Sequence, residues 1–235
     1  MLDGTALVAL SLAVILLTQL LYRWLKGEGA PPLGLRFSIR RCVELLIGIL
    51  LGVAFAILPW VIALSKGTAQ VNDSIAVHFD DLSIIRIISI AFLLLLIQSV
   101  MEETANRAFP IRIWEHRSLA FRVLVPSIFF AAVHLADEQF SFERIAILVM
   151  AGVIQSFAYL LTGNVWFSSG VHAGANLATF SISGLWHAGA VMRIVGQPAF
   201  PNWVAVMLML GAMSMAYFVS GRYKTKHTHS ATSAA

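Results

Sequence analysis

Seven apolar runs alternate with shorter polar connections along the chain. The runs cover residues 4–22, 43–64, 84–101, 118–135, 144–162, 164–183 and 203–220. Backbone groups in hydrocarbon must satisfy their own hydrogen bonds, so an apolar run of about 20 residues predicts a helix that crosses the ~30 Å bilayer core. The pattern therefore predicts an all-α, polytopic membrane helical bundle with about seven transmembrane helices.

The connection at 184–201 is the exception to this regular pattern. Glycine and proline interrupt a moderately apolar stretch there, at Gly184, Gly189, Gly196, Pro198 and Pro201. Such residues mark turns and loops. The segment is a loop, a re-entrant segment or an eighth span, and the sequence leaves these three possibilities open.

Composition excludes a soluble domain. Of the 235 residues, 59% are hydrophobic and only 12% are charged, against roughly 45–50% and about 25% in soluble domains. Cys42 is the one cysteine, which excludes an intramolecular disulfide and a zinc site built from several thiolates. A metal would have to rest on histidines and carboxylates.

The basic residues indicate how the chain is oriented. Twelve of the 16 fall on alternate connections, after the first, third and seventh runs. Because cytoplasmic loops carry the excess of Lys and Arg, we expect an integral protein of the plasma (inner) membrane with its N-terminus outside and its C-terminus cytoplasmic. The basic residues form no patch with interleaved aromatics, so we expect membrane lipid as a partner and no nucleic acid.

The chain shows no internal repeat and no soluble second domain. We expect one membrane-embedded domain over residues 1–224, with the motif-bearing core at about 84–183. The low-complexity end at 225–235 is typical of a disordered cytoplasmic tail.

Two adjacent carboxylates directly continue the third apolar run. On an α-helix Glu103 and Arg107 are four residues apart and share a face, so we expect them to pair, while Glu102 points about 100° away. An unpaired carboxylate in a low-dielectric site is suited to act as a general base. The alternative is a charged cap at the cytoplasmic end of the helix.

Two further polar clusters lie within later apolar runs. Phe130 and His134 are four residues apart in the fourth run, and His172 and Asn176 share a face in the sixth. An ionisable group in a bilayer costs about 2.5–3.5 kcal/mol on insertion scales, so its presence suggests a function. The small residues Gly170 and Gly174 would also fit a helix packing seam.

Together the clusters can perform chemistry on water. A carboxylate and an imidazole can deprotonate a water molecule, and a second imidazole and an amide N–H can donate to the oxyanion of a tetrahedral intermediate. The chain has neither a Gly-x-Ser-x-Gly elbow nor a His-Glu-x-x-His motif, which argues against those two hydrolytic designs.

The ordered motifs Glu-Glu-x-x-x-Arg at 102–107, Phe-x-x-x-His at 130–134 and His-x-x-x-Asn at 172–176 resemble the CPBP family of intramembrane proteases. That family includes CAAX prenyl endopeptidases and bacteriocin-processing or self-immunity proteins. The resemblance implies an endopeptidase that hydrolyses a peptide bond of a membrane-associated protein or peptide. It further implies site residues with three roles: water activation by Glu102 and His134, oxyanion binding by His172 and Asn176, and shaping of the site by Glu103, Arg107 and Phe130.

The family is described both as metalloproteases and as metal-independent glutamate proteases. Glu102, His134 and His172 could supply three ligands of a catalytic zinc. A glutamate that ligates metal is not free to act as a base, so we favour the metal-independent mechanism and expect no cofactor, with zinc as the open alternative.

The run boundaries conflict with this site. They place Glu102 and His134 at opposite ends of neighbouring helices, roughly 25 Å apart at ~1.5 Å per residue. The two residues can share a water only if the third helix continues to about residue 109 and the fourth continues past 135 into 136–140.

Two other functions remain open. A non-catalytic membrane binding, immunity or scaffold protein of the same fold would keep the helices without the reaction. A transporter would use the buried Glu, His and Arg as a proton relay.

Overall fold

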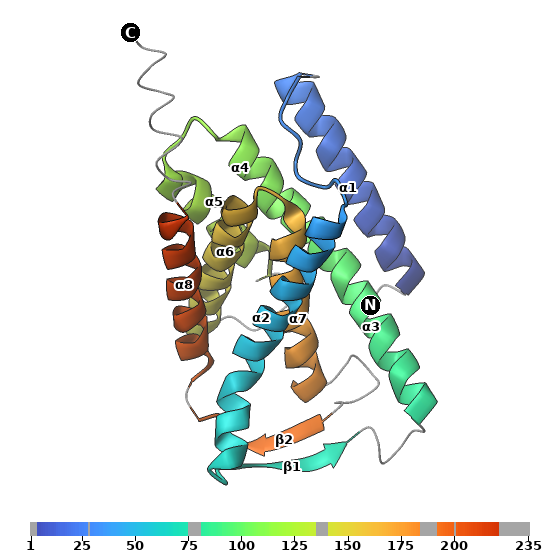
Figure 1. Ribbon diagram of the computed structural model, residues 1–235, viewed down its shortest axis with the longest axis vertical. Helices are drawn as coiled ribbons and strands as arrows, with labels where there is room; N and C mark the ends of the chain where they lie inside the picture. Colours follow the sequence, from blue (N-terminus) through green and yellow to red (C-terminus); the bar gives the residue numbers. More distant parts are fainter. Residues whose placement is uncertain are drawn as a thin grey trace.

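The computed structural model describes residues 4–27, 29–74, 81–134, 141–183, 192–199 and 201–220. These residues are predominantly helical (Figure 1). The helices are α1 (Gly4–Lys26), α2 (Ile39–Ser65), α3 (Asp81–Glu103), the π-helix η2 (Thr104–Ala108), α4 (Phe109–Ile113), α5 (Leu119–His134), α6 (Phe142–Thr162), α7 (Val165–Ser183) and α8 (Asn202–Val219).

Each of the seven predicted runs corresponds to a helix, which confirms the all-α bundle. Four helical stretches are long and apolar enough to cross a membrane: Gly4–Lys26, Ile39–Ser65, Leu82–Ile113 and Phe142–Thr162. α5 and α8 are apolar but shorter. Leucines at 12, 16, 17 and 20 of α1 are all more than half exposed, as expected for side chains that face lipid rather than water.

Among the described helices, α2 and α7 make the most extensive contact (Figure 1). Gly48 of α2 faces Gly170 of α7, and a Cβ added at Gly170 would lie 3.1 Å from the Gly48 Cα. Gly52 and Gly174 face backbone atoms of the other helix in the same way. Small residues allow helix backbones to approach closely, so the predicted packing seam exists and its partner is α2.

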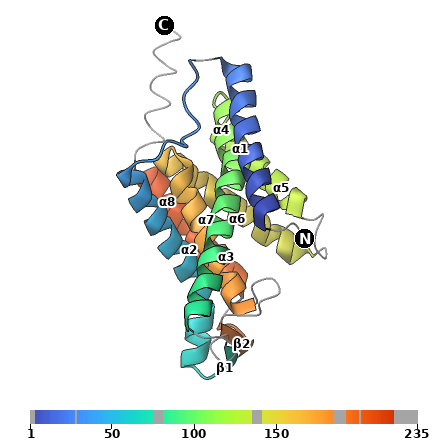
Figure 2. The ribbon, with the colours of Figure 1, turned by 90° about the vertical axis from the view of Figure 1, so that its right-hand side faces the viewer.

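The other helices flank this pair. α1 packs along α3 on one side, and α5, α6 and α8 pack together on the other (Figures 1 and 2). The core between α6, α7 and α8 contains Phe157, Phe167, Met209 and Met213. α7 therefore lies between α2 and α3 with its central turns buried, which removes the polar residues of those turns from lipid.

A two-stranded sheet lies at the opposite end of the molecule from α4 (Figures 1 and 2). β1 (Ala69–Ser74) pairs with β2 (Met192–Gly196) in antiparallel register, with Ala69 opposite Gly196. Part of the uncertain connection at 184–201 is thus an extended strand, and neither a re-entrant helix nor an eighth span occupies residues 192–199. Residues 184–191 and 200 lie outside the described residues, as does the predicted tail at 225–235.

Candidate active site

The polar site is built on a helix that is longer than its apolar run. α3, η2 and α4 continue one another from Asp81 to Ile113, so Glu102 lies well inside the helical stretch instead of at its end. The extension of the third helix that a shared site requires is therefore present. The corresponding extension of the fourth helix concerns residues 135–140, which lie outside the described residues.

His172 joins the two adjacent carboxylates. Its Nδ1 is 3.0 Å from Oε1 of Glu103, within hydrogen-bond distance, and its Nε2 is 3.7 Å from Oε2 of Glu102. The Glu103 side chain is fully buried and that of His172 is 10% exposed. A buried carboxylate that accepts from one ring nitrogen fixes the orientation of the imidazole, so the second nitrogen is directed toward Glu102.

Gln98 holds the other end of the Glu102 carboxylate. Its Nε2 donates to Oε1 of Glu102 at 2.8 Å, one helical turn earlier in α3. Gln98 is not among the site residues predicted from the sequence, although the i, i+4 spacing of an amide and a carboxylate in an apolar run is a detectable signal. The hydrogen bond leaves Oε2 as the carboxylate oxygen that faces His172.

The expected ion pair between Glu103 and Arg107 is wrong. Their spacing assumed an α-helix, but the chain follows a π-helix here, in which the Phe109 N–H donates to the Thr104 carbonyl. Arg107 Nη1 donates instead to the carbonyl of Asn106 at 2.9 Å. Glu103 is consequently free to accept from His172.

Phe130 links both histidines and the arginine. The Arg107 guanidinium carbon lies 4.5 Å from the centre of the Phe130 ring, in cation–π contact. The Phe130 ring centre is 4.3 Å from that of His134 and 6.0 Å from that of His172. The three motifs therefore meet at one depth, and Phe130 lies at their junction.

His134 and Asn176 have fewer contacts with this cluster than the other predicted site residues. The His134 Nδ1 lies 2.8 Å from the Phe130 carbonyl oxygen, which matches an Nδ1–H donor with Nε2 as the acceptor. Within the described part of the chain, no polar contact joins His134 to Glu102. Asn176 follows His172 by one turn of α7, and no side-chain hydrogen bond joins it to another described residue.

Several buried polar atoms of the cluster have no hydrogen-bond partner among the described residues. They are Oε2 of Glu102, Oε2 of Glu103, and Nε and Nη2 of Arg107. Buried polar groups are normally hydrogen-bonded because an unmade bond costs roughly 1–3 kcal/mol. A group of such atoms around one histidine is thus able to bind a polar substrate group or water.

The zinc alternative is not supported by this arrangement. In the part of the chain that the structure describes, no group of three or more His, Cys, Asp and Glu side chains is placed to hold a metal ion. Nδ1 of His172 is bonded to Glu103, and the Phe130 ring contacts both histidines. The set Glu102, His134 and His172 is therefore not assembled as zinc ligands.

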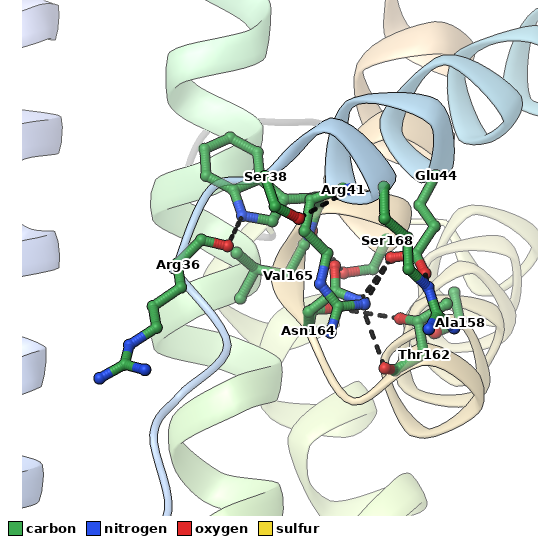
Figure 3. Close-up of polar contacts among 11 residues, drawn as sticks. Arg36, Ser38, Arg41, Glu44, Ala158, Thr162, Asn164, Val165 and Ser168 are labelled. Carbon is green, nitrogen blue, oxygen red and sulfur yellow. Dashed lines mark hydrogen bonds and ion pairs between the residues drawn. The ribbon is translucent and has the colours of Figure 1, made fainter.

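A second polar cluster fixes the start of α7 (Figure 3). Asn164 accepts from the Trp166 N–H at 2.9 Å through Oδ1, as an N-cap residue does. Its Nδ2 donates to Oε2 of Glu44 at 2.8 Å, and Arg41 Nη1 donates to the same oxygen at 2.6 Å. The cluster ties α7 to the first turns of α2 and thereby sets the position from which His172 extends.

Comparison with known proteins locates one family match. Residues 84–178 match the family model described as "Type II CAAX prenyl endopeptidase Rce1-like". The comparison with curated proteins gave no match, and neither did the comparison with solved structures. The matched segment begins in α3 and ends in α7, so it contains all three motifs and every residue of the polar cluster around His172.

Proposed function

We propose that the chain is a CPBP-type intramembrane protease that hydrolyses a peptide bond of a membrane-associated protein or peptide. The match of residues 84–178 to the Rce1-like family model supports this proposal. The observation that carries this proposal is the contact of His172 with both Glu102 and Glu103 inside the bundle. A structural charge pair needs one carboxylate, whereas water activation and orientation of the imidazole need two.

We assign the role of general base to Glu102. Its Oε2 has no hydrogen-bond partner among the described residues, while Oε1 is held by Gln98. In the proposed reaction Oε2 takes a proton from water, and the water oxygen attacks the scissile carbonyl carbon. Glu102 then gives that proton to the amide nitrogen as the C–N bond breaks, and the second proton of the water passes from the new carboxylic acid to the amine, leaving a carboxylate and an ammonium group.

The remaining residues stabilise the intermediate in this scheme. Glu103 orients His172, which with a proton on Nε2 donates to the oxyanion, and the Asn176 amide one turn later provides a second donor. His134 assists through Nε2, because its Nδ1 bonds the Phe130 carbonyl. Phe130 of α5, with the Arg107 guanidinium of η2 over its ring, supports this arrangement.

The substrate class follows the family description. We propose a peptide with a prenylated C-terminal CAAX sequence, in which X is the final residue. The enzyme acts within the plasma membrane with its N-terminus outside and its C-terminus cytoplasmic. The basic residues on alternate connections support this orientation.

The test is release of the C-terminal tripeptide from a farnesylated CAAX peptide by the detergent-purified protein, followed by mass spectrometry. We expect Glu102→Gln and His172→Ala to lower the rate at least ~100-fold, because general acid–base catalysis contributes about 10²–10⁴-fold. Glu115→Gln is the matched control, since Glu115 pairs with Lys26 at an exposed site.

Cleavage by Glu102→Gln at the rate of the Glu115→Gln control would reject the catalytic assignment. If no variant or wild-type protein cleaves but all of them bind the peptide, the non-catalytic binding function is correct. An unprenylated peptide of the same sequence shows whether the lipid is required.

A further inference from the structure

An open cleft lies away from the site, between the end of α1 and the segment that follows it. Its volume is about 790 Å³. Gln19, Arg23 and Trp24 of α1 line one wall, and Leu33, Leu35 and Arg36 line the other. The lining of the cleft thus combines apolar side chains with two guanidinium groups.

Among the described residues, the two arginines of the cleft have no carboxylate partner, unlike the basic residues around them. Lys26 pairs with Glu115 at 3.2 Å, and Arg40 and Arg41 pair with Glu44. In the described ranges no carboxylate pairs with Arg23 or Arg36. Figure 3 shows the Arg36 side chain directed away from the Glu44 cluster.

The second wall of the cleft is held in place. Tyr22 donates through its hydroxyl to the Pro31 carbonyl at 2.8 Å, and Trp166 Nε1 donates to the Arg36 carbonyl at 3.2 Å. Gly34 adopts φ +88°, and a Cβ there would lie 2.5 Å from the Asn164 Cα. The segment is therefore packed against the α6–α7 turn, and the cleft is preformed.

The surroundings of the cleft are those of a membrane interface. Trp24 is 79% exposed, and Phe37 and Ile39 next to Arg36 are 63% and 86% exposed. Tryptophan beside arginine is typical of the headgroup region of a bilayer. The sequence places this end of α1 on the basic, cytoplasmic side.

From this geometry we propose that the cleft binds an anionic glycerophospholipid of the inner leaflet. Guanidinium groups bind phosphate oxygens through paired N–H donors, and basic pockets at the cytoplasmic face of membrane proteins bind anionic headgroups. Leu33 and Leu35 contact the glycerol and first acyl carbons, while Arg23 and Arg36 contact the phosphate. The proposal is independent of the peptidase reaction.

Native mass spectrometry of the detergent-purified protein tests the site with phosphatidylglycerol and phosphatidylcholine of the same acyl chains. We expect wild type to retain phosphatidylglycerol preferentially. The double variant Arg23→Gln, Arg36→Gln should bind it about 30-fold more weakly, and each single variant about fivefold, from the known contribution of a basic residue near a lipid surface.

The double variant Arg86→Gln, Arg117→Gln is the matched control, because it removes two exposed arginines that lie outside the cleft. Its lipid retention should equal that of wild type. Three results would overturn the proposal: equal retention of the two lipids by wild type, unchanged phosphatidylglycerol retention in the single or double cleft variants, or displacement of the lipid by equimolar inorganic phosphate. If the double variant does not fold, the single variants and the wild-type lipid preference decide the question.

Discussion

A substitution at the contact between α2 and α7 should impair cleavage, although the altered residue lies outside the candidate active site. Gly48 lies on α2, and a Cβ at this position would be 2.5 Å from the Phe167 carbonyl oxygen and 2.9 Å from the Val171 N. Ordinary contact begins at 3.4 Å. In Gly48→Ala the two helices must therefore separate by about 0.9 Å, since both neighbouring atoms are backbone and cannot rotate away.

The separation has two measurable consequences. Overpacking lowers the free energy of unfolding by about 1–3 kcal/mol. The better helix propensity of alanine offsets ~1 kcal/mol of this loss. Displacing α7 also displaces His172, whose Nδ1 lies 3.0 Å from Oε1 of Glu103. The donor and acceptor atoms of an N–H···O hydrogen bond lie only about 2.7–3.2 Å apart. A misplacement of ~1 Å in a catalytic group lowers rates about 100-fold.

Thermal unfolding in detergent and the peptide cleavage assay measure the two effects. Gly211→Ala in α8 is the matched control, because nothing lies within 4 Å of a Cβ there. Because Gly211→Ala gains the same helix propensity without overpacking, we expect its Tm to rise by about 2–4 °C and its cleavage rate to be unchanged. The apparent Tm of Gly48→Ala should lie about 2–12 °C below that of Gly211→Ala, and its cleavage rate should fall about 100-fold. A Gly48→Ala protein that matches Gly211→Ala in both assays would refute the argument that close helix packing sets the position of His172.

Two smaller predictions concern the hydrogen bonds of individual side chains. Gln98→Leu removes the donor to Glu102 Oε1, and we expect kcat to fall about 10- to 150-fold with KM unchanged, because a hydrogen bond to a charged group contributes roughly 1.5–3 kcal/mol. Steady-state kinetics checks this, and an unchanged kcat would contradict a positioning role. Asn164→Ala removes the α7 cap and the bond to Glu44, so the unfolding free energy should fall by about 1–2 kcal/mol relative to an exposed Asn72→Ala control. Equal unfolding of the two variants would show that the cap does not stabilise α7.

The helices could be predicted from the sequence because hydrocarbon leaves the backbone few alternatives. The third helix was predicted too short, since hydropathy falls at Glu102 and Glu103 although the backbone continues to Ile113. The sheet was missed for a different reason. Its strands at 69–74 and 192–196 are far apart in the chain, and neither carries the alternating apolar pattern of a half-buried strand.

The site could be predicted as a set of residues but not as a set of contacts. Helical spacing identifies neighbours on one helix, and it correctly indicated that Glu102 and Glu103 occupy different environments. The bond between Glu103 and His172 joins residues on different helices, and no periodicity in the sequence reports on such a pair. The roles of His134 and Asn176 remain predictions.

One sequence signal would have corrected the misassigned ion pair. Pro110 has no N–H, so it cannot donate to the carbonyl of Asn106, its i−4 residue, as an α-helix requires. The chain adopts a π-helical turn just before this point, and Arg107 donates to the orphaned carbonyl. π-helical turns are frequent at functional sites, and the consequence here is chemical. With Arg107 held between the Asn106 carbonyl and the Phe130 ring, Glu103 is the carboxylate that binds His172, and Glu102 keeps the oxygen that faces it.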